Sequence, residues 1–247
     1  MNRKHLGMAT ILAALLLIVA AGCGDGDIEA NLSFEYDFSE TAEGWTGDFT
    51  DLPVDYEEDI YDLKFGHEDL PGEIPGGGKA LMISAINRSD DIFMYVKKQL
   101  TAADGIAPST TYRIFFEVEF ATDAPAGAVG VGGPPGEAVW VKVGAAAVEP
   151  VPVEMDVHAI PYYGLNVDKG WQNEDGENAL RIGDVAKTDN DEFNVYELKT
   201  LDNAEQPLEI SSDEEGNLWI FVGTDSGFEG RTTLYYNQIR VALQQVQ

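Results

Sequence analysis

Apolar and polar residues alternate along most of this chain. In the segment 112–120, positions 112, 114, 116, 118 and 120 are apolar, while Glu117 and Glu119 stand between them. This period of two predicts a strand with one face in a core and the other toward solvent. Short runs of the same kind occupy 32–38, 80–86, 92–96, 139–143, 195–198, 218–222 and 234–243. The pattern therefore predicts an all-β protein.

The segments between these runs are typical of turns. Clusters of Gly, Pro, Asn and Asp separate them, and no long segment carries apolar residues at a helical period. Many strands with such connections favour an antiparallel β-sandwich, and we expect a single jelly-roll-like domain over 32–247. Two acidic, turn-rich segments, 51–75 and 149–191, interrupt the strand rhythm. Loops of that length often bind ligands.

The first 23 residues have the pattern of an export signal. Arg3 and Lys4 precede an apolar run over 8–21, and small residues precede Cys23. The run is shorter than the ~20 residues that a membrane-spanning helix needs. The segment resembles a bacterial lipoprotein signal, with Ala20 in place of the usual Leu. The resemblance implies a signal peptide over 1–22, a lipid on Cys23 and a short tether over 23–31. The alternative is an ordinary secretory signal.

This resemblance places the protein outside the cytoplasm, lipid-anchored to a bacterial membrane at the cell surface or periplasmic face. Cys23 is the single cysteine, so no internal disulfide is available. The formal net charge is −29. Such a balance excludes nucleic acid and anionic headgroups as partners, since both need a positive surface, and permits cation binding.

The two ends of the expected domain carry a second resemblance. The aromatic and acidic run 34–38, followed by Gly44 and Trp45, and the run 232–241 resemble the first and last strands of jelly-roll carbohydrate-binding modules. The resemblance implies a sandwich that binds glycans. It also implies a calcium ion shared by the two strands, although Asn237 stands where those modules usually have Asp. Aromatic residues in loops are the candidates for ligand binding: Trp45, Tyr162, Tyr163 and Trp171.

Acidic residues in two loops are candidate calcium ligands, because Ca²⁺ takes six to eight oxygen donors. They are Asp168, Glu174, Asp175, Asp225 and Glu229. The spacing does not match the loop of an EF-hand, so any calcium here is expected to be structural.

Three carboxyl groups offer a catalytic alternative. Glu35, Asp37 and Glu40 form an E-x-D-x-x-E pattern that resembles the catalytic strand of retaining jelly-roll β-glucanases, with Glu35 as nucleophile and Glu40 as acid/base. The first hypothesis is a non-catalytic, membrane-anchored sandwich that binds carbohydrate or another extracellular ligand. A retaining glycoside hydrolase is the second, and an adhesion or envelope-assembly protein the third.

Overall fold

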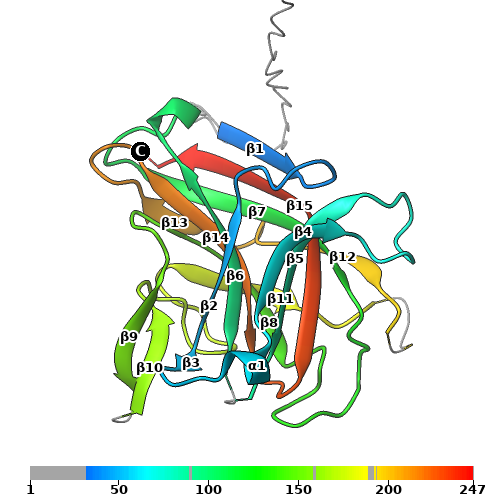
Figure 1. The fold of residues 1–247 in the computed structure, drawn as a ribbon. Helices are drawn as coiled ribbons and strands as arrows, with labels where there is room; N and C mark the ends of the chain where they lie inside the picture. The colour runs from blue at the N-terminus through cyan, green and yellow to red at the C-terminus, as the bar shows by residue number, and fades with distance from the viewer. Residues whose placement is uncertain (1–31, 89–90, 158–159, 189–191, 193, 247) are drawn as a thin grey trace, which may run out of the picture.

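The protein is an antiparallel β-sandwich. The computed structural model describes residues 32–88, 91–157, 160–188, 192 and 194–246, so the signal peptide, Cys23 and the tether lie outside the described residues. Figure 1 labels the strands β1 (Leu32–Asp37), β2 (Thr46–Thr50), β3 (Leu52–Pro53), β4 (Lys64–Asp69), β5 (Lys79–Ile86), β6 (Phe93–Leu100), β7 (Thr111–Thr122), β8 (Val139–Ala146), β9 (Pro152–Val157), β10 (Ile160–Leu165), β11 (Ala179–Asp184), β12 (Glu197–Asp202), β13 (Leu208–Ser211), β14 (Leu218–Ser226) and β15 (Arg231–Gln245). The helices are short: α1 (Glu58–Tyr61) and a 3₁₀ turn, Ala102–Asp104. No helix of the described residues is long and apolar enough to cross a membrane.

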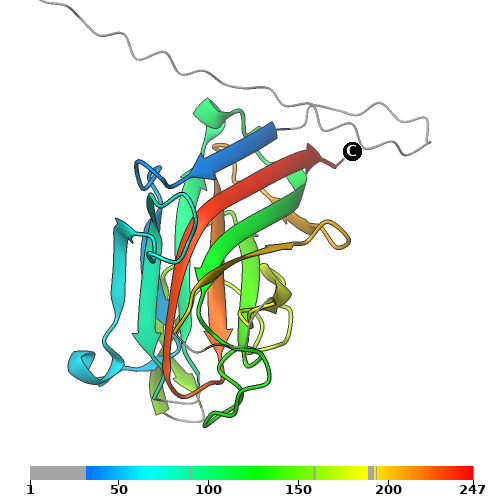
Figure 2. The same ribbon diagram turned by 90° about the vertical axis from the view of Figure 1, so that its right-hand side faces the viewer.

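The first sheet is built around the last strand. Its order is β12-β7-β15-β5-β4, with β1 also paired to β15 and β13 to β7. In Figure 2, β15 runs beside β7 along the length of the molecule, with β1 at one end. A bulge between Tyr236 and Gln238 interrupts the pairing with β7. A 15-residue strand thus joins three neighbours into one layer.

The second sheet has the order β11-β8-β14-β6-β2. Along β7 of the first sheet, Tyr112, Ile114, Phe116, Val118 and Phe120 are buried, as the alternation predicted. They pack in one core with inward-facing residues of the second sheet, among them Met94, Val96, Val141, Val143 and Val222. The predicted antiparallel β-sandwich is therefore confirmed.

Trp45 belongs to this core. It is 2% exposed, and its ring packs edge-on against Tyr36, with centroids 5.3 Å apart, and against Phe38 at 6.1 Å. The residue ends a turn between β1 and β2, so the sequence suggested an exposed loop aromatic. The prediction that Trp45 binds ligand is wrong, because its ring is enclosed by β1.

The two turn-rich segments contain secondary structure. Residues 51–75 include β3, α1 and β4, and residues 149–191 include β9, β10 and β11. β3, β10 and β9 form a small third sheet, in which Leu52 pairs with Tyr163. Both views place this sheet at the end of the molecule opposite β1 (Figures 1 and 2). The hairpin of β9 and β10 is thus held to the second sheet through the chain that follows β2.

Candidate functional site

A pocket of about 340 Å³ opens beside the β9–β10 hairpin. Its walls come from β9, β10 and the loop that follows them, and we call it the hairpin pocket. Its lining includes Met155, Tyr162, Asn166, Asp168 and Trp171, together with buried Asp51 and Lys169. Trp171 is 49% exposed, which is unusual for the largest apolar side chain. An indole thus stands in a concave site with polar neighbours, the composition typical of small-ligand pockets.

The loop from 166 to 178 is held in shape by its own polar groups. Asp168 accepts hydrogen bonds from the backbone N–H of Gly170, at 3.0 Å, and of Glu177, at 2.9 Å. These bonds lower the pKa of Asp168 below its ordinary value. Gly170 has a φ of 72°, and a Cβ there would lie 2.3 Å from the carbonyl oxygen of Glu174, so a side chain does not fit. The loop that carries Trp171 is therefore a closed, defined structure.

Beneath this loop lies a buried charge cluster of Asp51, Asp91, Lys142, Lys169 and Asp225. Carboxylate oxygens of the three aspartates lie within 4.8 Å of one another. The Lys169 ammonium lies 2.6 Å from Asp225 Oδ2 and 2.7 Å from Asp51 Oδ2. Lys142 Nζ lies 3.0 Å from the same oxygen of Asp225. Two strands, β8 and β14, and three connecting segments thus meet in one cluster, whose residues are all buried.

The cluster fixes the loop to the sheet. Lys142 of β8 donates hydrogen bonds to the carbonyl oxygens of Lys169, at 2.7 Å, and Glu174, at 3.0 Å. The Lys169 ammonium also lies over the ring of Phe93, 5.1 Å from its centroid. Phe93 packs with Leu165 on the outer face of the second sheet. The hairpin and its loop therefore cover that face.

Burial shifts the protonation of this cluster. Burial raises the pKa of Asp51 to about 6, although the Lys169 ammonium opposes the shift. Burial, with the negative charges of Asp225 and Asp51, raises the pKa of Asp91 to about 10, so Asp91 holds a proton at neutral pH. Burial lowers the pKa of Lys142. Burial alone would lower the pKa of Lys169 too, but the carboxylates, Asp225 first, outweigh it and raise that pKa.

We expect the protein to be more stable at pH 5 than at pH 8. From 3.8, its ordinary pKa, to about 10, folded Asp91 holds a proton that the unfolded chain has lost, and Asp51 does so up to about 6. The folded state binds more protons in this window, so the free energy of unfolding falls as the pH rises. Urea unfolding at the two pH values measures the difference. Asp91→Asn should reduce the difference, and equal stability of the wild type at both values would contradict the expectation.

The four aromatic residues that were predicted to bind a ligand do not all lie at one site. Tyr162 and Trp171 both line the hairpin pocket. Tyr163, the next residue of β10, is absent from that lining and sits opposite Leu52 of β3. Trp45 lies in the core. The pocket therefore brings together two of the four.

The five acidic residues that were predicted as calcium ligands also lie at different sites. Among the described residues, the one group of three or more acidic or His side chains close enough to share an ion is Asp51, Asp91 and Asp225, and it contains a single predicted ligand, Asp225. Asp168 and Asp175 accept backbone hydrogen bonds in the loop, and Glu174 contributes its carbonyl oxygen to Lys142. Glu229 lies in the turn before β15, where its N–H bonds to the carbonyl of Val131.

The group around Asp225 does not fit a calcium ion. Two ammonium groups, of Lys142 and Lys169, already lie within 3.0 Å of Asp225 Oδ2. Positive charge at that distance repels a divalent cation and uses the oxygens that would bind it. At the end of β1, the side-chain amide of Asn237 donates a hydrogen bond to Glu119, at 2.6 Å. Lysine therefore takes the place of a metal in the buried charge cluster.

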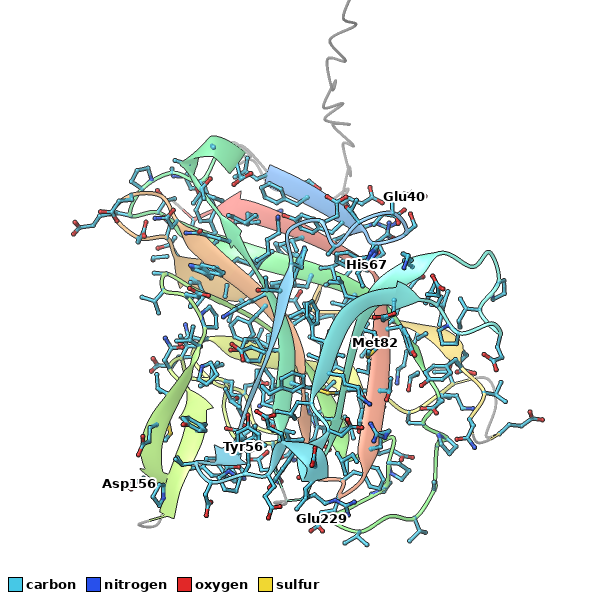
Figure 3. All side chains as sticks on the ribbon, viewed as in Figure 1. Glu40, Tyr56, His67, Met82, Asp156 and Glu229 are labelled. Carbon is cyan, nitrogen blue, oxygen red and sulfur yellow. The ribbon has the colours of Figure 1, made fainter. Side chains whose placement is uncertain are left out.

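The three carboxyl groups of the catalytic alternative lie elsewhere. Glu35 faces outward on β1 and is ion-paired with Arg240, at 3.2 Å. Asp37 is exposed and accepts a hydrogen bond from the N–H of Ser39. Figure 3 places Glu40 at the β1 end and Asp156 of β9 at the opposite end. None of the three lines the hairpin pocket.

Four residues of the cluster were not singled out from the sequence. Lys142 offered the clearest signal, because it interrupts the apolar strand run 139–143. A lone charge in a run that reads as buried requires a partner of opposite sign. That partner, Asp225, lies on β14, the strand paired with β8. The sequence does not show which distant acidic residue fills this role.

Comparisons with known proteins give only distant matches. No protein-family model matches the sequence, and a search of the curated proteins finds no match either. Among solved structures, one from a study of the promiscuous specificity of carbohydrate-binding modules of the β-sandwich superfamily matches at 14% sequence identity with a TM-score of 0.37. The match covers 86% of this chain and 61% of that one. A carbohydrate-binding module that recognises mannan matches at 14% sequence identity with a TM-score of 0.38, and the match covers 86% of this chain and 98% of the module. A xylan-binding domain from Paenibacillus barcinonensis matches at 12% sequence identity with a TM-score of 0.36, and the match covers 92% of this chain and 100% of that domain.

This chain thus spans less than two thirds of the first of these structures. At such TM-scores and identities, the matches add no argument about function. The fold is assigned from the sheets of this chain, and the function has to be argued from its pocket.

Proposed function

We propose that this protein is a non-catalytic carbohydrate-binding domain whose ligand occupies the hairpin pocket. The observation that carries the proposal is the presence of Tyr162 and half-exposed Trp171 in the lining of one pocket. The faces of a sugar ring carry C–H groups that pack on an aromatic ring, while its hydroxyls need polar partners at the edge. Asn166 and Asp168 of the same lining supply polar groups.

The charged residues in the lining of the hairpin pocket determine which class of sugar it favours. Backbone hydrogen bonds lower the pKa of Asp168, which keeps its carboxylate charged at neutral pH. The positive charge of Lys169 is neutralised by contacts with Asp51 and Asp225. The pocket therefore favours neutral sugars or amino sugars and disfavours uronic acids, whose carboxylates would meet negative charge.

Replacing Trp171 by Ala should weaken binding about 30-fold, the equivalent of about 2 kcal/mol for a central aromatic anchor. Titration calorimetry with neutral, amino-sugar and uronic-acid oligosaccharides measures the change. Val129→Ala is the matched control, because Val129 is a fully exposed apolar residue outside the pocket. Wild-type protein that binds none of the three sugar classes would refute the proposal, and binding unaffected by Trp171→Ala would move the site elsewhere.

The pocket also fits the anchoring that the sequence predicts. We propose that a lipid on Cys23 holds the protein to a membrane outside the cytoplasm. The described chain begins at β1, and the β9–β10 hairpin, which contributes residues to the lining of the pocket, lies at the opposite end of the molecule (Figure 1). An anchor before β1 would thus leave the pocket facing away from the membrane. A Cys23→Ser variant that stays in the membrane fraction would contradict the anchor.

A further inference from the structure

The buried charge cluster places an amine against a carboxyl group under unusual conditions. Lys169 Nζ lies 2.6 Å from Asp225 Oδ2, and Asp225 is fully buried. The other oxygen of that carboxylate, Oδ1, is also buried, and the side chains of Asp91 and Asp225 are hydrogen-bonded to each other. Asp51 touches the same ammonium at 2.7 Å. Asp91 lies beside both aspartates, within the 4.8 Å group.

Such an ion pair is costly to keep buried. Desolvation of each charged group costs several kcal/mol, which attraction between the charges only partly returns. An amide of the same two groups carries no charge, so its burial has no such cost. Two reacting groups fixed in contact also have an effective concentration far above that in solution, about 10⁵–10⁸ M in well-oriented cases. Closed surroundings exclude the water that would reverse the reaction.

We propose that Lys169 and Asp225 join in an intramolecular isopeptide bond. The reacting carbon, Cγ of Asp225, is bonded to the oxygen that Lys169 already contacts. The proposal concerns a modification of this chain and does not depend on the identity of the ligand.

The reaction balances without any external reagent. Asp51 takes one proton from the Lys169 ammonium, and Asp91 gives its proton to an oxygen of Asp225. The amine lone pair then attacks Cγ and forms the C–N bond, while the C=O π electrons move onto the remaining oxygen. The nitrogen loses a second proton to Asp91. Asp51 passes its proton to the departing hydroxyl, the C–O bond breaks, the carbonyl re-forms and one water leaves.

Asp51 and Asp91 return to their starting states, as a base and an acid in contact with the reacting groups should. Lys142 has a different role. Its Nζ lies 3.0 Å from Asp225 Oδ2 and donates to the carbonyl oxygens of Lys169 and Glu174. It is a positioning residue, which also stabilises negative charge on the Asp225 oxygen during the attack. Lys169 is the nucleophile because its contact with Asp225 is shorter and because it alone of the two lysines touches Asp51.

The bond would fasten the loop of the hairpin pocket to β14. Lys169 lies two residues before Trp171, and Asp225 lies on the central strand of the second sheet. The wall of the pocket would then be held by a covalent link in a chain without an internal disulfide. Loss of the bond should therefore increase the motion of this loop more than that of the sandwich.

Intact mass spectrometry of the purified full domain tests the proposal. The wild type should weigh one water less than its sequence, and a digest should contain one branched peptide that joins the segments around Lys169 and Asp225. Lys169→Arg keeps the charge but cannot form the amide, so its mass should be the full value. Asp91→Asn should form the bond much more slowly, while Glu209→Ala, which changes an exposed ion pair outside the cluster, should form it as the wild type does.

A folded wild type at full mass, with separate peptides for Lys169 and Asp225 after prolonged incubation, would overturn the proposal. A water lost within a single peptide, as in cyclisation of an aspartate, would overturn it too. Neither result would affect sugar binding by Trp171, so the two proposals fail separately.

Discussion

Replacing Asp225 by Ala should lower the free energy of unfolding by about 3–5 kcal/mol, the range for removing one partner of a buried ion pair and also that for losing a covalent cross-link between distant residues. Asp225 Oδ2 lies 2.6 Å from Lys169 Nζ and 3.0 Å from Lys142 Nζ, and its removal leaves two buried ammonium groups without the carboxylate that both contact. Urea or thermal unfolding followed by circular dichroism measures the loss.

Glu209→Ala is the control for this variant. Glu209 pairs with Arg113 at 2.7 Å, but both side chains are about half exposed, so the expected loss is below about 1 kcal/mol. If the two substitutions cost the same, water reaches the buried charge cluster and the energetic argument for the cross-link fails as well.

The second large effect is expected for Trp45→Ala. Removal of a buried Trp ring from contact with Tyr36 and Phe38 should cost about 3–5 kcal/mol of stability. The folded fraction of this variant should bind ligand as the wild type does, because Trp45 lies outside the lining of the pocket.

Trp171→Ala should show the reverse, with a change in stability within about 0.5 kcal/mol, as for exposed positions, and weakened binding. Unfolding curves and calorimetry on both variants make the comparison. A Trp45→Ala protein of unchanged stability would show that the turn before β2 is not part of the core.

The strands of the core could be predicted from the sequence, and those of the small third sheet could not. In β7 the alternating side chains are buried on one face, so burial imposes the pattern. In β9, Glu154, Met155 and Asp156 are consecutive exposed residues, and β10 contains Pro161. The strands of such a small sheet bury few side chains on either face, and so nothing imposes a period of two on them.

The candidate site, too, could be predicted from the sequence only in part. Exposed aromatics in a turn-rich segment indicated Tyr162 and Trp171 correctly as neighbours of one pocket. The same reasoning failed for Trp45, because position between strands does not determine burial. The contact of Lys169 with Asp225 joins residues 56 positions apart in the sequence. Such a pairing depends on how the hairpin folds over the second sheet, which local sequence does not encode.

The position of β14 and β15 has a consequence for biosynthesis. β14 is the middle strand of the second sheet, and β15 joins β1, β5 and β7 in the first. Neither layer is complete until residues 218–245 have left the ribosome, so β1 has no native partner, and pairs such as β2 with β6 and β4 with β5 stay unjoined to the rest of their sheets, through most of translation. A late-closing core keeps the nascent chain unfolded for longer, the state in which a polypeptide can be threaded across a membrane.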